Sequence, residues 1–182
     1  MLISNHVLAG ASVGALCPSV PTALGVGVLS HFALDAVPHF GKVAATHRLA
    51  VCVVDGLSGL VLCAAVLYRA PAQDRIRVGV GIFGACLPDT DKPLRLFFSN
   101  PYHPEWFIRF HGRIQTEHEV WLQEVAVAFM LAGVVGYVFH NHRVAGETFD
   151  TRCDKPDPTS KRFLGRIKNK VAAKMFPVVS GL

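Results

Sequence analysis

Residues 30–39 read SHFALDAVPH, and they place two imidazoles and one carboxylate at the end of an otherwise apolar stretch. On a helix, His31 and Asp35 are four residues apart and share one face. Pro38 disfavours helical backbone at the residue before it, so we expect the helix to end there and His39 to lie at its mouth. Burying such groups among apolar side chains costs free energy. The stretch therefore predicts a helix end that binds a divalent metal, with zinc preferred and manganese as the alternative.

The composition is that of a membrane protein rather than of a soluble domain. Of the 182 residues, 51% are hydrophobic and 17% are charged, whereas about 25% charged residues are usual in a soluble domain. Residues 49–67 contain Asp55 as their only charge, and at about 1.5 Å per residue they nearly match a hydrocarbon core of about 30 Å. Residues 125–139 carry no charge and predict a second span.

We expect an all-α fold, a polytopic membrane bundle of about five helices with a polar site at one end. Prolines and turn residues divide the chain into helices at about residues 6–17, 21–37, 46–69, 74–87 and 105–139. Asn5 has the residue type of an N-cap for the first helix. Residues 1–140 then form the membrane-embedded domain, and residues 141–182 form a basic linker and an amphipathic tail.

A second group of ligand types follows the fourth helix. Residues 84–93, GACLPDTDKP, place Asp89 and Asp91 just after a helix stop. Two carboxylates in such a turn can converge on one cation. The alternative interpretation is an ordinary capping turn.

A third group lies in residues 111–119, HGRIQTEHE. His111, Gln115 and His118 recur at helical spacing and form a stripe on the predicted fifth helix, which Glu119 borders. The alternative interpretation is the polar half of an amphipathic helix.

Short connections make consecutive helices antiparallel, and this arrangement brings all three groups to the same end of the bundle. Asp55 lies near that end, two turns inside the first predicted span, where ionisable residues usually face a functional interior or a partner. It is either part of the site or the structural partner of a histidine. The predicted metal ligands are His6, His31, Asp35, His39, Asp89, Asp91, His111 and His118.

Catalytic roles can be assigned to a few further side chains. Glu119 or Asp55 could act as general base or orient a ligand, and Arg109 or Arg113 could bind a phosphate. No serine nucleophile motif, phosphate-binding glycine loop or dinucleotide glycine pattern occurs, which disfavours those classes of enzyme.

The order of these motifs resembles a group of bacterial integral-membrane proteins described as metal-dependent hydrolases. The resemblance covers residues 1–140, and its later segment departs from the group, where it often reads His-Arg-Gly-x-Thr-His-Ser. The segment at residues 31–39 is also distantly similar to zinc-dependent phospholipases C and single-strand nucleases. These likenesses imply a metal-dependent reaction on a phosphoester. The motifs that carry the first one are His6-x-x-x-Gly10-x-x-x-Gly14, His31-x-x-x-Asp35-x-x-Pro38-His39, Gly84-x-x-x-Pro88-Asp89-x-Asp91 and the histidine segment that starts at His111.

The C-terminal tail predicts contact with lipid. Residues 161–176 alternate apolar and basic side chains at helical spacing, which is typical of a helix that binds an anionic membrane surface. Nucleic acid is a less suitable partner, since the net charge is only +5. Of the 18 Lys and Arg residues, 12 lie at the end opposite the site, nine of them in the tail. The positive-inside rule then predicts a multi-pass protein of the bacterial inner membrane with a cytoplasmic tail.

Three hypotheses of function follow. The first is a membrane-bound metal-dependent hydrolase acting on a phosphoester. The second is a membrane protein that binds metal for structure or sensing and has no catalytic activity. The third is a structural membrane protein with buried polar pairs and no metal.

Overall fold

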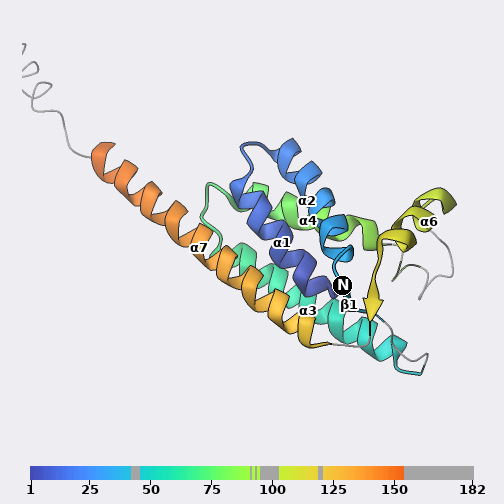
Figure 1. Ribbon diagram of the computed structural model, residues 1–182. Helices are drawn as coiled ribbons and strands as arrows, with labels where there is room; N and C mark the ends of the chain where they lie inside the picture. The colour runs from blue at the N-terminus through green and yellow to red at the C-terminus, as the bar shows by residue number, and fades with distance from the viewer. Residues whose placement is uncertain (42–45, 91, 93, 95–102, 119–120, 154–182) are drawn as a thin grey trace, which may run out of the picture. The chain divides into compact units, whose positions relative to one another are not determined.

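The computed structural model describes residues 1–41, 46–90, 92, 94, 103–118 and 121–153, and these residues are mostly helical (Figure 1). The helical fold class predicted from the sequence is thus confirmed. In chain order the elements are α1 (Ile3–Leu16), α2 (Val20–Asp35), β1 (His39–Phe40), α3 (Arg48–Arg69), α4 (Arg75–Cys86), the 3-10 helix η1 (Leu87–Asp89), α6 (Glu105–Ile114), β2 (Glu117–His118) and α7 (Leu122–Cys153).

The first four predicted helices correspond to α1, α2, α3 and α4, with ends that differ by a few residues. α2 begins with a capping box, in which Ser19 and Thr22 satisfy each other's backbone N–H groups. The N-cap of α1 is Leu2 and not Asn5, so that prediction is wrong. Asn5 lies inside α1 with its side chain fully buried.

The single helix predicted over residues 105–139 is also wrong, because the chain leaves the helix at the end of α6 and forms β2 before α7 begins. β2 pairs in parallel with β1, with His39 opposite Glu117. The backbone N–H of Thr116 donates to the carbonyl of Asp35 at 3.2 Å. These tertiary hydrogen bonds replace the helical ones that the sequence pattern predicts, so the spacing of residues 111–118 does not decide their structure.

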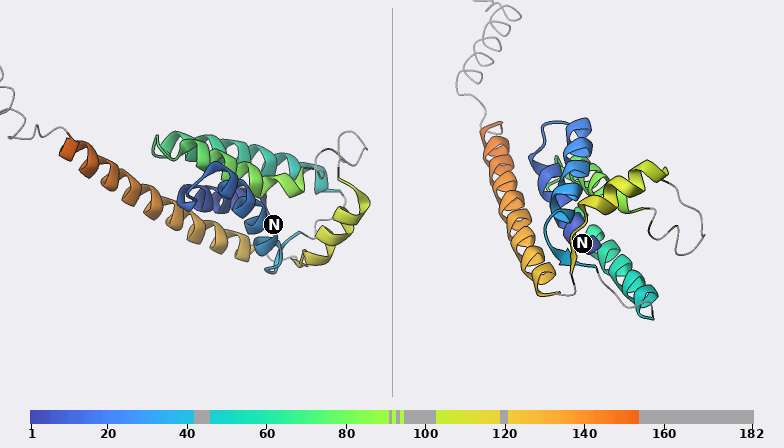
Figure 2. Two further views of the ribbon diagram at one scale, coloured as in Figure 1. Left: turned by 90° about the horizontal axis from the view of Figure 1, so that it is seen from above. Right: turned by 45° about the vertical axis from the view of Figure 1, so that its right-hand side comes forward.

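Helices α1, α2 and α4 pack closely together. Figure 2 shows the blue α1 and α2 beside the green α4. A Cβ at Gly10 would lie 2.6 Å from the carbonyl oxygen of Gly81, and a Cβ at Gly27 would lie 2.5 Å from the same oxygen. Only glycine allows the three backbones to approach so closely. This approach stacks the rings of His6 and His31, whose centroids are 4.2 Å apart.

Helices α3 and α7 are long and apolar enough to cross a membrane, over Leu49–Arg69 and Leu122–Ala145. α3 contacts α1 and α4 along one side. α7 contributes Val135, Val138 and Phe139 to the apolar core that α1, α3 and α4 build. Most of the remaining surface of both helices is exposed.

The chain divides into two compact units, Met1–His142 and Arg143–Leu182. The first unit holds α1 to α6 and the first two thirds of α7, and all the site residues described below belong to it. The amphipathic helix predicted over residues 161–176 lies outside the described residues.

Candidate metal centre

Five buried side chains meet where α2 and α4 end. Four of them, His6, His31, Asp35 and Asp89, each offer a ligand atom, and these atoms all lie within 4.8 Å of one another. His111 of α6 joins them, with its Nε2 3.0 Å from Asp35 Oδ2. We call these five residues the His/Asp cluster. The structure therefore brings together residues that are separated by up to 105 positions in the chain.

The carboxylate of Asp35 lies in the middle of the cluster. Its Oδ2 is 3.2 Å from His31 Nε2 and 3.0 Å from His111 Nε2, while its Oδ1 is 3.4 Å from His6 Nε2. Asp89 lies on the other side of the two imidazoles, with Oδ1 3.7 Å from His31 Nε2 and 3.5 Å from His111 Nε2. Three nitrogens and two carboxylates thus surround one small volume.

The ring of His31 is oriented by the backbone of α4. Its Nδ1–H donates to the carbonyl of Ala85 at 2.7 Å, so in the neutral imidazole Nε2 carries the lone pair. That lone pair faces His111 Nε2 at 3.0 Å and the oxygens of Asp35 and Asp89. A cation among these atoms would attract all of them, and a backbone carbonyl on the far ring nitrogen is the usual arrangement for a metal-binding histidine.

Several buried atoms of this region have no hydrogen-bond partner among the described residues. They are both ring nitrogens of His6 and Nε2 of His39, while Oδ1 of Asp89 has only the ion pair with Lys92. His39 Nδ1–H donates to the carbonyl of Val37 at 2.8 Å, which leaves the lone pair of its Nε2 4.0 Å from Asp35 Oδ1. Buried polar atoms without partners are rare because each costs free energy, so this group indicates a ligand.

The pKa values follow from burial and from the neighbouring charges. Burial lowers the pKa of His6 to about 4, although the nearby carboxylates of Asp35 and Asp89 act in the opposite direction. Burial would raise the pKa of Asp35, but its contacts with His111, His31 and His6 outweigh burial and lower the pKa. Near pH 7, His6 is therefore neutral and Asp35 is ionised, which are the forms that bind a metal ion.

The geometry fits a small divalent cation. Zinc binds histidine nitrogen and carboxylate oxygen at about 2.0 Å, so two ligand atoms of a tetrahedral site are about 3.3 Å apart. The distances of 3.0 to 3.7 Å from His31 and His111 to the two carboxylates are close to that value. Imidazole together with carboxylate suits zinc, manganese or iron, and the donor set does not distinguish them.

Three residues beside the cluster contact its carboxylates, and the sequence pattern had singled out only Gln115 among them. The side-chain amide of Gln115 donates to Asp35 Oδ2 at 3.0 Å. Lys92 Nζ lies 2.8 Å from Asp89 Oδ1, and its side chain is 44% exposed. This pairing lowers the pKa of Asp89, against the effect of burial, and raises the pKa of Lys92. The amino group of Met1 lies 3.0 Å from Asp35 Oδ1.

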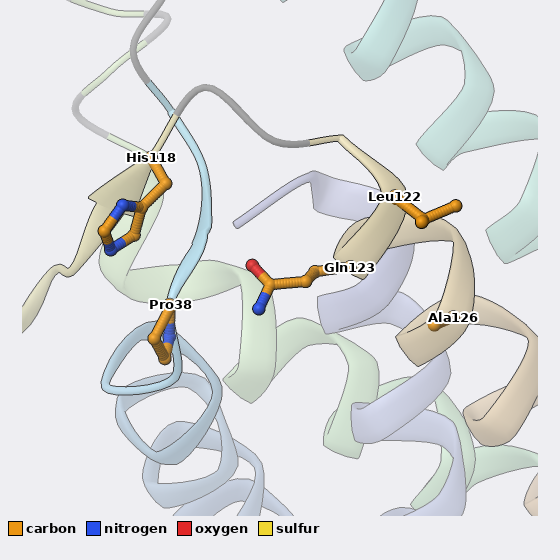
Figure 3. A pocket seen from close by; sticks show the side chains of 5 residues that line it. All are labelled: Pro38, His118, Leu122, Gln123 and Ala126. Carbon is orange, nitrogen blue, oxygen red and sulfur yellow. The ribbon is translucent and has the colours of Figure 1, made fainter.

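The remaining predicted site residues lie elsewhere. His118 is exposed on β2 and lines a pocket of about 510 Å³ together with Pro38, Leu122, Gln123 and Ala126 (Figure 3). Both oxygens of Asp55 accept the backbone N–H of Ile3, at 3.1 and 3.0 Å, so this carboxylate caps the start of α1. Asp91 and Glu119 lie outside the described residues.

The two arginines that were predicted to bind phosphate are exposed on α6. Arg109 pairs with Glu105 at 2.6 Å, one helical turn away on the same helix. Lys92 and the amino group of Met1 are described cations that contact the His/Asp cluster directly, and Lys92 is the more exposed of the two. The position of Lys92 three residues after Asp89 was the available signal in the sequence, since i and i+3 side chains meet on a helical turn.

Comparison with known protein families, with curated proteins and with solved structures finds no match for this chain.

Proposed function

We propose that this protein is a membrane-bound hydrolase that uses a divalent metal, zinc in the first instance, to act on a phosphoester. The observation that carries the proposal is the convergence of four ligand residues, His6, His31, Asp35 and Asp89, beside buried imidazole nitrogens of His6 and His39 that have no hydrogen-bond partner among the described residues. A cation at this point would satisfy several of them together.

A bound divalent ion supplies Lewis acidity, which lowers the pKa of a coordinated water and stabilises negative charge on a phosphoryl oxygen. The residues of the chain have distinct tasks around it. His31, held by Ala85, and Asp35, held by Gln115, present fixed lone pairs. Lys92 is the partly exposed cation beside Asp89 and is suited to bind a phosphate oxygen. We retain Glu119 as the proposed general base.

A bilayer location is supported by the surfaces of α3 and α7. In the most apolar window of each helix only 11% and 22% of the residues are buried. Large apolar side chains such as Leu60, Val61 and Phe129 are 69%, 70% and 76% exposed. A core helix of a soluble protein would bury such residues, whereas lipid solvates them. We propose that both helices cross a bacterial inner membrane and that the basic tail lies on the cytoplasmic side.

A non-catalytic metal site is the second candidate, and the burial of the cluster favours it. His6, His31 and Asp35 are fully buried, and structural zinc sites are closed in this way, whereas catalytic sites keep one position open. Asp89 and His111, at 10% and 7% exposure of their side chains, form the more open side.

Metal analysis of the purified full-length chain in detergent tests the proposal, together with the variants His31→Ala and Asp35→Ala. We expect about one or more equivalents of a transition metal in the wild type and a large loss in both variants. Turnover of a panel of phosphoesters that depends on the metal then separates the hydrolase from a structural site. Absence of metal from the wild type, or equal metal in all three proteins, would contradict both candidates.

A further inference from the structure

We propose that Glu124 is a positioning residue for the metal site, because its buried carboxylate joins the helix that carries His6 to the strand that carries His39. This inference rests on the proposed metal site. It concerns the contacts that fix the backbone beside two of its histidines, His6 and His39. Glu124 lies in the first turn of α7 and is 2% exposed. It belongs to one of the two candidate membrane helices, where a buried carboxylate is costly unless it is fully bonded.

One oxygen of this carboxylate holds the start of α1. Glu124 Oε2 accepts the side-chain amide of Asn5 at 2.6 Å and the backbone N–H of Leu2 at 3.2 Å. The backbone carbonyl of Glu124 accepts the same amide at 3.3 Å. The first N–H groups of a helix have no partner within the helix, so an acid at this point stabilises the helix start. His6 follows Asn5 directly, and its position therefore depends on this contact.

The other oxygen holds β1. Glu124 Oε1 accepts the backbone N–H of Phe40 at 3.0 Å. His39 precedes Phe40, and its own N–H donates to the carbonyl of Thr116 in the adjacent strand segment at 3.0 Å. The backbone around His39 is thus fixed on one side by the strand pair and on the other by α7.

The two histidines next to the contacts of Glu124 both face Oδ1 of Asp35. His6 Nε2 and His39 Nε2 lie 3.4 and 4.0 Å from Asp35 Oδ1, and neither nitrogen has a hydrogen bond within the described residues. Stacking on His31 orients the ring of His6, and the carbonyl of Val37 orients the ring of His39, while the backbone contacts of Glu124 fix the segments that carry them. His31 is held instead by α4, where the carbonyl of Ala85 orients its ring. Loss of Glu124 should therefore affect His6 and His39 and leave His31 in place.

A matched control exists at the other end of α4. Asp74 is 1% exposed, and its oxygens pair with Arg77 and, at 2.7 Å, with His142. It is as buried as Glu124 and both of its oxygens are bonded, but among the described residues its partners are Arg77 and His142 and no member of the His/Asp cluster. Removing its charge costs stability in a similar way without disturbing the metal ligands.

The experiment uses the full-length chain in detergent, loaded with cobalt(II), whose visible absorption reports the number and type of ligands. Glu124→Gln keeps the size of the side chain but sets an amide N–H against either the donors of Asn5 and Leu2 or the N–H of Phe40. We expect its cobalt affinity to fall by about 10- to 100-fold, as is usual for residues that orient ligands, with a changed spectrum. Asp74→Asn should melt at a lower temperature yet keep the affinity and spectrum of the wild type.

A wild-type spectrum and affinity in Glu124→Gln would overturn the inference, whatever its melting temperature, and so would an equal change in Asp74→Asn. If Glu124→Gln does not fold, Glu124→Asp carries the same test, because it keeps the charge and shortens the reach by one methylene. A wild type that binds no cobalt would overturn the metal site itself and this inference with it. Failure of the positioning role alone is thus distinguishable from failure of the proposed function.

Discussion

The two ends of α4 carry buried carboxylates in different surroundings. At its start, the oxygens of Asp74 pair with the guanidinium of Arg77 and the imidazole of His142. At its end, Asp89 and Asp35 lie among several imidazoles, and the ring nitrogens of His6 and Nε2 of His39 lack a hydrogen bond within the described residues. The helix of 12 residues separates the two regions by about 18 Å.

This difference shows how a structural polar group is distinguished from a ligand site. Around Asp74, each carboxylate oxygen meets a donor, although Arg77 Nε has no hydrogen-bond partner among the described residues. In the His/Asp cluster Met1, Gln115 and Lys92 contact the carboxylates, but both ring nitrogens of His6 have no hydrogen bond within the described residues. Burial alone does not separate the two regions, since Asp74 and Asp35 are 1% and 0% exposed. The imidazole nitrogens without partners do.

The largest expected effect is that of Asp35→Asn, which removes the carboxylate at the middle of the cluster. The affinity for zinc should fall by more than about 100-fold, since changes at residues that merely orient ligands already cost 10- to 100-fold. Competition with a chromophoric chelator measures this affinity. Asp74→Asn is the control at the other end of α4, and equal losses in both variants would erase the proposed distinction between the two regions.

The second effect is on the stability of the wild type. Zinc at 100 times its dissociation constant should raise the free energy of unfolding by about 2.7 kcal/mol, because the metal binds the folded state. Thermal unfolding in detergent, with and without chelator, measures the difference as a shift in Tm. The shift should vanish in Asp35→Asn and remain in Asp74→Asn. A shift of the same size in Asp35→Asn would place the zinc elsewhere in the chain.

The third effect concerns the polar group around Asp74. Asp74→Asn should lower the free energy of unfolding by about 1 to 3 kcal/mol, because Arg77 and His142 lose a charged acceptor. Chemical denaturation in detergent measures this loss. His142→Asn, which keeps Asp74 paired with Arg77, is expected to cost less. No loss of stability in Asp74→Asn would show that this group is not structural.

The smallest effect is expected from Lys92→Met. The ammonium group of Lys92 lies 2.8 Å from Asp89 Oδ1 and competes with a metal ion for that oxygen. Its removal should tighten zinc binding by a few-fold, and a calorimetric titration is sensitive enough to measure this. Arg109→Met, whose charge pairs with Glu105 on α6, is the matched control and should have no effect. Weaker binding in Lys92→Met would mean that the lysine supports the metal site and does not compete with it.

The sequence predicted the helices whose positions follow from hydrophobic spacing and proline stops. It also predicted the candidate ligands that share a face of such a helix. His31 and Asp35 share a helical face, and four helices lie within a few residues of their predicted positions. The stripe of His111, Gln115 and His118 was predicted only in part, because β2 replaces the helix after Ile114. His111 and Gln115 contact Asp35, whereas His118 lies on the exposed strand.

Contacts made by the backbone and by distant acids could not be predicted from the chain. The carbonyl of Ala85 orients His31, and nothing in the identity of an alanine indicates that role. Glu124 was one of two polar residues at the start of an apolar stretch, and only the fold brings it to Asn5 and Phe40. Asp55 was expected near the site. In the structure, its carboxylate accepts the backbone N–H of Ile3 and caps the start of α1.

By itself, the sequence determined a mostly helical, apolar chain in which imidazoles and carboxylates gather at the helix ends, because helical spacing and proline stops are local properties. Only the tertiary structure decided which of those side chains meet around Asp35. Close contact of the glycines on α1, α2 and α4 stacks His6 on His31, and strand pairing brings His39 and α6 to the same place. Whether a buried nitrogen or oxygen finds a hydrogen-bond partner depends on residues far away in the chain. The sequence alone therefore does not show it.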